Sequence, residues 1–167
     1  MVMNPSAKGS IAEAVIAAEA VKAGVQVLRP LIEGARYDLA FDVDGRFVRV
    51  QCKWGTRQGA VVSAYIGTCR LTPHGYVRTT YDASEVDAFG VYCAELDECY
   101  LIPLRDVEGQ FKVQLRLTPA ANGQDLAIRY AETYRLNGAI AQLGERLAGS
   151  QKVGGSSPPG STPREAA

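Results

Sequence analysis

The chain has 167 residues, 47% of them apolar, which is long enough for one globular domain with its own hydrophobic core. Eighteen basic and eighteen acidic residues cancel to a net charge of zero, which argues against a protein whose only task is to grip nucleic acid. Four cysteines without Cys-x-x-Cys spacing indicate neither a disulfide framework nor a zinc site, and a single histidine, His74, rules out a histidine-rich metal cluster.

A first helix is predicted over residues 8–23, which are rich in alanine, contain no proline and precede Gly24, where a helix would end. Glu13 and Glu19 lie about 240° apart around this helix, so only one of them can face a neighbouring element. Ser10-Ile-Ala-Glu13 also fits a capping box, in which Glu13 would bond back to the amide of Ser10. Glu13 is therefore either a helix cap or a side chain directed at the rest of the fold.

A long hairpin is predicted over residues 36–54, after a short strand at 25–29. Its two alternating strands are joined by Asp44-Gly45, which favours a two-residue turn because both residues tolerate positive φ. Counting outward from the turn places Asp38 opposite Gln51, with Lys53 on the same face. The other face is apolar and is formed by Leu39, Phe41, Val43, Val48, Val50 and Cys52. One face is thus predicted to build core, while the other gathers a carboxylate, an amide and an amine.

The polar face carries the groups that a metal-dependent phosphodiesterase needs. Carboxylate and amide oxygens hold a hard divalent cation, and an ammonium group offsets charge on the attacked phosphate or helps to activate water. The hairpin ends in the motif Gln51-Cys52-Lys53. It resembles the PD-(D/E)XK nuclease superfamily, and within it the branch of group I intron-associated homing endonucleases. In that branch the last motif commonly reads Gln-x-Lys, which Gln51-Cys52-Lys53 matches. Tyr37 stands in place of the superfamily's proline, and the resemblance extends over residues 8–134.

This resemblance implies a magnesium-dependent homing endonuclease that hydrolyses phosphodiester bonds of double-stranded DNA. Glu13 and Asp38 would bind Mg²⁺ directly or through water. Gln51 would occupy the position of a second acid, and Lys53 would assist the nucleophilic water or stabilise the pentacovalent phosphate. A domain this small spans only part of the long target that a homing enzyme reads, so a homodimer or homotetramer is expected.

The remaining elements are predicted to be further strands and one short helix. Residues 60–71 are apolar but broken by Gly67, residues 72–80 are expected to form a loop or an edge, and residues 88–94 and 99–103 a buried hairpin. A strand at 112–117 and a short helix at 128–134 complete the predicted α/β (α+β) fold, a restriction-endonuclease-like mixed β-sheet flanked by helices. Asp87, just before the buried hairpin, is either a further metal ligand or a turn or cap residue.

The charges are distributed unevenly along the chain. Residues 45–81 contain six basic side chains and no acid, whereas residues 82–108 contain eight acids and a single base. The chain could therefore present one basic surface to a polyanion, unless the fold interleaves the two segments. The candidates for contact with DNA phosphates or bases, as opposed to a merely solvated surface, are Arg49, Arg57, Arg70, Tyr76 and Arg78.

The chain changes character after residue 136, and residues 154–163 are mostly glycine, serine and proline. We expect an endonuclease-like domain at 1–136 and a disordered tail at 137–167 without functional residues. Residues 140–146 and 155–158 can be encoded by codons that resemble the D arm and the T arm of a transfer RNA. The tail is therefore either selected protein sequence or a reading frame that overlaps a transfer-RNA gene.

Three other functions are compatible with the same pattern. A structure-specific nuclease, such as a Holliday-junction resolvase, would cut by branch shape. A non-catalytic DNA-binding module would keep the basic segment without cleavage, and a structural domain would show no salt-dependent DNA affinity.

The N-terminus lacks the apolar core of a signal peptide, and no apolar run is long enough to cross a membrane, so a cytoplasmic protein is expected.

Overall fold

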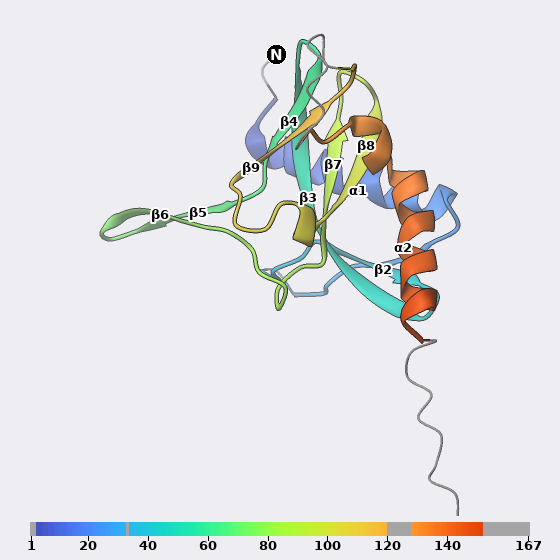
Figure 1. Cartoon of the computed structure of the whole chain (residues 1–167). Coiled ribbons are helices and arrows are strands. Elements are labelled where there is room, and N and C mark those ends of the chain that lie inside the picture. The colour runs from blue at the N-terminus through green and yellow to red at the C-terminus, as the bar shows by residue number, and fades with distance from the viewer. Residues whose placement is uncertain (1–2, 33, 120–127, 152–167) are drawn as a thin grey trace, which may run out of the picture.

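A seven-stranded mixed sheet forms the centre of the molecule (Figure 1). The structure is a computed structural model that describes residues 3–32, 34–119 and 128–151, with side chains up to residue 145. The elements are α1 (Pro5–Lys22), β1 (Gln26–Leu28), β2 (Leu39–Val43), β3 (Arg46–Gln58), β4 (Val61–Tyr65), β5 (Thr68–Thr72), β6 (Gly75–Thr79), β7 (Ala88–Cys93), β8 (Glu98–Pro103), β9 (Lys112–Arg116) and α2 (Leu136–Gln151), with short 3-10 helices at Leu104–Asp106 and Ala131–Tyr134. The sheet runs β1-β2-β3-β4-β9, and β7 pairs in parallel with β3 and antiparallel with β8. The predicted α+β fold with a mixed sheet is confirmed.

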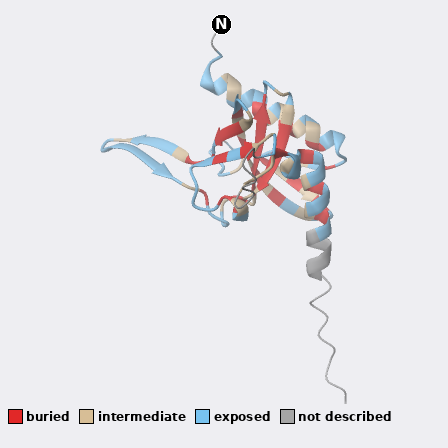
Figure 2. Ribbon diagram, turned by 45° about the horizontal axis from the view of Figure 1, so that its top comes forward, coloured by how far each residue is buried: buried red, intermediate tan, exposed pale blue. Residues whose placement is uncertain are grey.

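Two hydrophobic clusters pack against the two faces of the sheet. Strand β7 contributes to both, because Ala88 and Tyr92 join one cluster while Phe89 and Val91 join the other. Helices α1 and α2 cover the first cluster, and strands β4, β8 and β9 build much of the second. Figure 2 shows the buried residues concentrated in the middle of the sheet. No helix in the described ranges is long and apolar enough to cross a membrane.

The hairpin of β2 and β3 forms in the predicted register. Val43 pairs with Arg46, and the turn residues Asp44 and Gly45 have φ of 52° and 77°. Both values lie in the left-handed region that this dipeptide accepts readily. All six side chains predicted for the core face are buried. The prediction of a hairpin with one apolar and one polar face is therefore confirmed.

Helix α1 begins earlier than predicted, at Pro5. Asn4 is its N-cap, and the Oδ1 of Asn4 accepts a hydrogen bond from the backbone amide of Ser6 at 2.7 Å. Ser10 consequently lies inside the helix, where its amide is not an unpaired end group. The interpretation of Glu13 as a capping residue bonded to Ser10 is wrong.

Strands β5 and β6 form a separate two-stranded sheet, called the arm here (residues 68–79), which projects away from the main sheet (Figure 1). Residues 72–80 were expected to form a loop or an edge, and the structure has the edge, because β6 pairs with β5 alone in this two-stranded sheet. The chain leaves the main sheet at Gly67, where a Cβ atom would lie 2.6 Å from the ring of Phe111. Only glycine leaves room for this close approach.

Helix α2 occupies the beginning of the predicted tail, and the predicted boundary between residues 136 and 137 falls at its start. Leu136 and Ile140 are buried in the first cluster, and Leu143 packs against it. These apolar residues recur every three to four positions and form one stripe of the helix. The expectation that the chain beyond residue 136 adds no core is therefore wrong for this helix. The low-complexity run at 154–163 lies outside the described residues.

A chain ending at residue 136 is expected to unfold more easily than one ending at residue 151. It loses the side chains of Ile140 and Leu143 from the core, which should lower the free energy of unfolding by about 2–4 kcal/mol. Urea denaturation of both chains and of the full chain measures the difference, and the chain ending at 151 controls for shortening alone. Equal stability of the two truncated chains would show that α2 is not part of the domain.

Candidate active site

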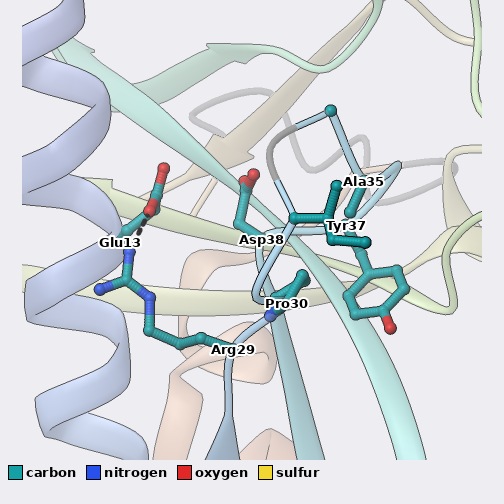
Figure 3. A pocket seen from close by; sticks show the side chains of 8 residues that line it. Glu13, Arg29, Pro30, Ala35, Tyr37 and Asp38 are labelled. Carbon is teal, nitrogen blue, oxygen red and sulfur yellow. Dashed lines mark hydrogen bonds and ion pairs between the residues drawn. The ribbon is translucent and has the colours of Figure 1, made fainter.

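A pocket opens between helix α1 and the start of β2. It encloses about 340 Å³ and is lined by Glu13, Arg29, Pro30, Ile32, Gly34, Ala35, Tyr37 and Asp38. Figure 3 shows the side chain of Glu13 on the helix and that of Asp38 at the strand, with both carboxylates pointing the same way. The two carboxylates predicted as metal ligands therefore line one pocket.

Asp38 is held in place by two hydrogen bonds from β3. Its Oδ2 accepts one from Nε2 of Gln51 at 2.6 Å and one from the backbone amide of Cys52 at 2.7 Å. Within the described residues, Oδ1 accepts no hydrogen bond, so one oxygen fixes the side chain and the other is available to a cation. Burial raises the pKa of Asp38, and the Cys52 amide and the Lys53 ammonium act against this rise.

Lys53 lies two residues beyond Gln51 on the same face of β3, and its side chain is partly buried. Its Nζ is 5.3 Å from the centre of the Tyr81 ring. Burial lowers the pKa of Lys53, while the carboxylate of Asp38 acts in the opposite direction. The predicted gathering of Asp38, Gln51 and Lys53 on one face is thus found in the structure, and their roles in catalysis stay predictions.

Glu13 approaches the pocket from α1 and forms an ion pair with Arg29. Nη2 of Arg29 donates to Oε2 of Glu13 at 2.7 Å, which ties the helix to the loop after β1. The other oxygen of Glu13 makes no hydrogen bond within the described residues. Sequence analysis missed this role of Arg29, because an arginine before Pro30 marks the end of a strand but does not reveal a partner on the helix.

Arg49 and Asp87 pair with each other and stay out of the pocket. Nε and Nη2 of Arg49 donate to the two carboxylate oxygens of Asp87 at 2.9 and 2.8 Å, and its guanidinium also donates to the carbonyls of Ala83 and Ser84. Burial acts to raise the pKa of Asp87, but the hydrogen bonds from Arg49 outweigh it and lower this pKa. Asp87 thus fits the alternative of a turn or cap residue, and the Arg49 guanidinium is engaged by groups of the protein itself.

The other candidate DNA-binding residues also lie outside the pocket. The register of the arm puts Tyr76 and Arg78 on one face and Arg70 on the other, and all three are exposed. Arg57 is exposed near the end of β3, where its Nε donates to the carbonyl of Gly59 at 3.0 Å. Of the five candidates, Arg49 is therefore bound to other groups of the protein, whereas Arg57, Arg70, Tyr76 and Arg78 are exposed on β3 and the arm.

The pocket offers oxygen ligands of the kind that Mg²⁺ prefers. Glu13 and Asp38 each have one carboxylate oxygen outside the hydrogen bonds described above, and Gln51, whose Nε2 donates to Asp38, carries an amide oxygen that accepts no hydrogen bond within the described residues. Across the described ranges, no group of three or more histidine, cysteine, aspartate or glutamate side chains gathers at one point. The residues fit a divalent cation held by two carboxylates and a neutral oxygen.

Comparisons with known proteins place these features in context. A family model described as PD-(D/E)XK endonuclease matches residues 3–137, a range that includes the whole pocket. The solved structure of a bacterial homing endonuclease, I-Ssp6803I, is similar with a TM-score of 0.70 and 24% sequence identity, over 89% of this chain and 99% of that chain. At this identity, the likeness concerns the fold. No protein with a curated description matches the chain.

Proposed function

Because the chain belongs to the PD-(D/E)XK endonuclease family, we propose that it is a homing-type endonuclease that hydrolyses phosphodiester bonds of double-stranded DNA with Mg²⁺. The observation that carries this proposal is the pocket itself, in which Asp38 is fixed by β3 and shares the lining with Glu13. The similar fold of a bacterial homing endonuclease supports the homing type.

The residues of the pocket and of the adjoining face of β3 would divide the work of hydrolysis. Asp38 and Glu13 would hold the cation, with Gln51 as a neutral donor. When bound, the cation supplies Lewis-acid charge at the phosphate and lowers the pKa of a water molecule. Hydrolysis forms a bond between a water oxygen and phosphorus and breaks the bond to the leaving sugar oxygen, which takes up a proton. Lys53 would orient the water or offset the charge that develops on the phosphate.

Glu13→Gln is expected to raise the Mg²⁺ concentration needed for half-maximal cleavage by about 10- to 100-fold. The change removes one of the two carboxylate charges without shortening the side chain. A magnesium titration of the cleavage rate at constant ionic strength measures it. Glu19→Gln on the same helix is the control, because Glu19 pairs with Lys22 at 2.7 Å outside the pocket. A wild-type magnesium requirement in Glu13→Gln would show that Glu13 is not a ligand.

The arm supplies a surface for DNA beyond the pocket. A two-stranded ribbon fits the major groove of DNA, and this one carries Arg70, Tyr76 and Arg78 in exposed positions. A two-stranded sheet has too little core to be stable alone, so a bound surface would add to its stability. Arg57 on β3 would contribute a further phosphate contact.

Replacing Arg70 and Arg78 together by alanine is expected to weaken DNA binding and reduce its dependence on salt. If each arginine contacts one phosphate, the slope of log K against log salt should fall by roughly 2. Fluorescence anisotropy of a labelled duplex at several KCl concentrations gives the slope. Arg105→Ala, which removes an exposed arginine from the acidic segment, should leave it unchanged. An unchanged slope in the double variant would exclude the arm from the DNA-binding surface.

The proposed activity is tested on a plasmid library with random inserts, in the presence of MgCl₂ or EDTA. A homing-type enzyme should linearise a small subset of clones, only with Mg²⁺, and those clones define its target. Stronger cleavage of a synthetic four-way junction than of linear duplex would instead indicate a structure-specific nuclease. DNA binding without cleavage of any substrate would indicate a non-catalytic module.

We also propose a homodimer or homotetramer. Within the described residues, one chain carries a single pocket that contains both predicted metal ligands, whereas a double-strand break needs two cuts. Light scattering after size-exclusion chromatography, with and without a cleaved duplex, should give twice or four times the mass of one chain. A monomer in both conditions would contradict this assembly.

A further inference from the structure

The ring of Tyr81 is shared by two cations, Lys53 and Arg36. Nζ of Lys53 lies 5.3 Å from the ring centre, and the guanidinium carbon of Arg36 lies 4.8 Å from it. Both distances are within the range of about 6 Å at which the negative face of an aromatic ring attracts a cation. We propose that Tyr81 is a positioning residue that holds the ammonium group of Lys53 at the catalytic pocket. This inference rests on the proposed nuclease function.

The Tyr81 ring is itself rigidly supported. It is only 8% exposed and packs edge-on against Phe89, with 5.6 Å between ring centres and 76° between ring planes. Phe89 on β7 pairs directly with Gln51 on β3. The two rings therefore lie next to the strand pair that carries the catalytic face, and Tyr81 has little freedom to move away from Lys53.

Lys53 has few other restraints. Its ammonium group sits on a flexible four-carbon stem. Among the described residues, the ammonium group makes no hydrogen bond or ion pair, and besides the longer-range attraction of the Asp38 carboxylate it has the contact with the Tyr81 ring. Without the ring, the ammonium would sample several positions, few of which suit the attacked phosphate.

Arg36 connects the same ring to the base of the arm. Its Nε donates to Oε1 of Glu85 at 2.6 Å, which fixes the guanidinium. Arg36 also lines a small pocket with Thr68, Arg70, Val77 and Thr79 of the arm. The Tyr81 ring therefore joins the proposed DNA-binding arm to the catalytic lysine.

The test compares Tyr81→Phe with Tyr81→Leu on a plasmid clone that the wild-type protein cuts. Within the described residues, the Tyr81 hydroxyl makes no hydrogen bond, so phenylalanine keeps the ring and should keep the single-turnover rate within about twofold. Leucine removes the ring and should lower this rate by roughly 3- to 30-fold, without a change in DNA affinity. Tyr100→Leu is the matched control, because it makes the same change in the same hydrophobic cluster, at a ring over which no cation of the described residues lies. It should lower stability but not the rate.

A second measurement needs neither DNA nor Mg²⁺. The ring current of Tyr81 should shift the NMR signals of the Lys53 ε-protons upfield in the wild type and in Tyr81→Phe, and this shift should be lost in Tyr81→Leu. If Tyr81→Leu does not fold, a highly fluorinated phenylalanine incorporated at position 81 keeps the ring shape while cancelling its negative face, and it should lower the rate similarly. Wild-type rates in the leucine or fluorinated protein would overturn the positioning role alone. A wild type that cuts nothing would overturn the nuclease function and this inference together.

Discussion

Asp38→Asn is expected to abolish cleavage, with a loss of at least about 100-fold in rate, while the fold and DNA affinity persist. Asparagine has the shape of aspartate, and its carbonyl oxygen can accept the same hydrogen bonds from Gln51 and the Cys52 amide. The substitution thus removes the negative charge that a cation needs and little else. Single-turnover cleavage measures the loss, and circular dichroism and a DNA-binding titration check the fold and the affinity.

Asp44→Asn is the matched control for this charge removal. Asp44 lies in the turn of the same hairpin with φ of 52°, a conformation that asparagine also tolerates, so cleavage should be unaffected. Lys53→Met, which keeps most of the side-chain stem but removes the ammonium, should match Asp38→Asn. If Asp38→Asn or Lys53→Met cut DNA like the wild type, the proposed mechanism would fail.

Ile16→Ala is expected to lower the free energy of unfolding by about 2–5 kcal/mol. Ile16 is completely buried where α1 crosses the sheet. It fits against Gly90, where a Cβ atom would lie 3.1 Å from Cγ2 of Ile16. Truncation leaves a cavity where the helix packs against Gly90 of the sheet. Because Glu13 lies one turn away on the same helix, cleavage should also fall in the folded fraction.

Val21→Ala provides the comparison for this variant, since Val21 is exposed on the same helix. Val21→Ala should change the free energy of unfolding by no more than about 0.5 kcal/mol. Urea denaturation followed by circular dichroism measures both proteins under the same conditions. An effect of Ile16→Ala as small as that of Val21→Ala would show that α1 does not pack on the sheet at this point.

The hairpin could be predicted in detail because its determinants are local. The Asp44-Gly45 turn sets the register, and strict alternation on both strands then decides which side chains share a face. For this reason Asp38 and Gln51 could be placed next to each other before the structure was considered. Glu13 was harder to place, since its local pattern allowed a cap, and only the start of α1 at Pro5 removes that alternative.

The features that sequence analysis missed depend on distant partners. Arg29 with Glu13 and Arg49 with Asp87 are ion pairs between separate elements, and no local pattern selects their partners.

Two elements were missed, wholly or in part, for local reasons. Helix α2 was assigned to the tail because a low-complexity run follows it, although its apolar residues have helical spacing. The second strand of the arm was predicted only as a loop or an edge, because it is exposed on both faces and so lacks the usual alternation of apolar and polar residues.

The two-residue turn between β2 and β3 also sets the order in which the site can assemble. A hairpin of neighbouring strands closes in about 1–10 μs, so Asp38, Gln51 and Lys53 can meet early in folding. The contacts of β3 with β7 and with α1 join distant segments and form more slowly. A newly synthesised chain would therefore bring its carboxylate, amide and lysine together before Glu13 and the Tyr81 ring arrive. Only the completed domain would then present the whole proposed site.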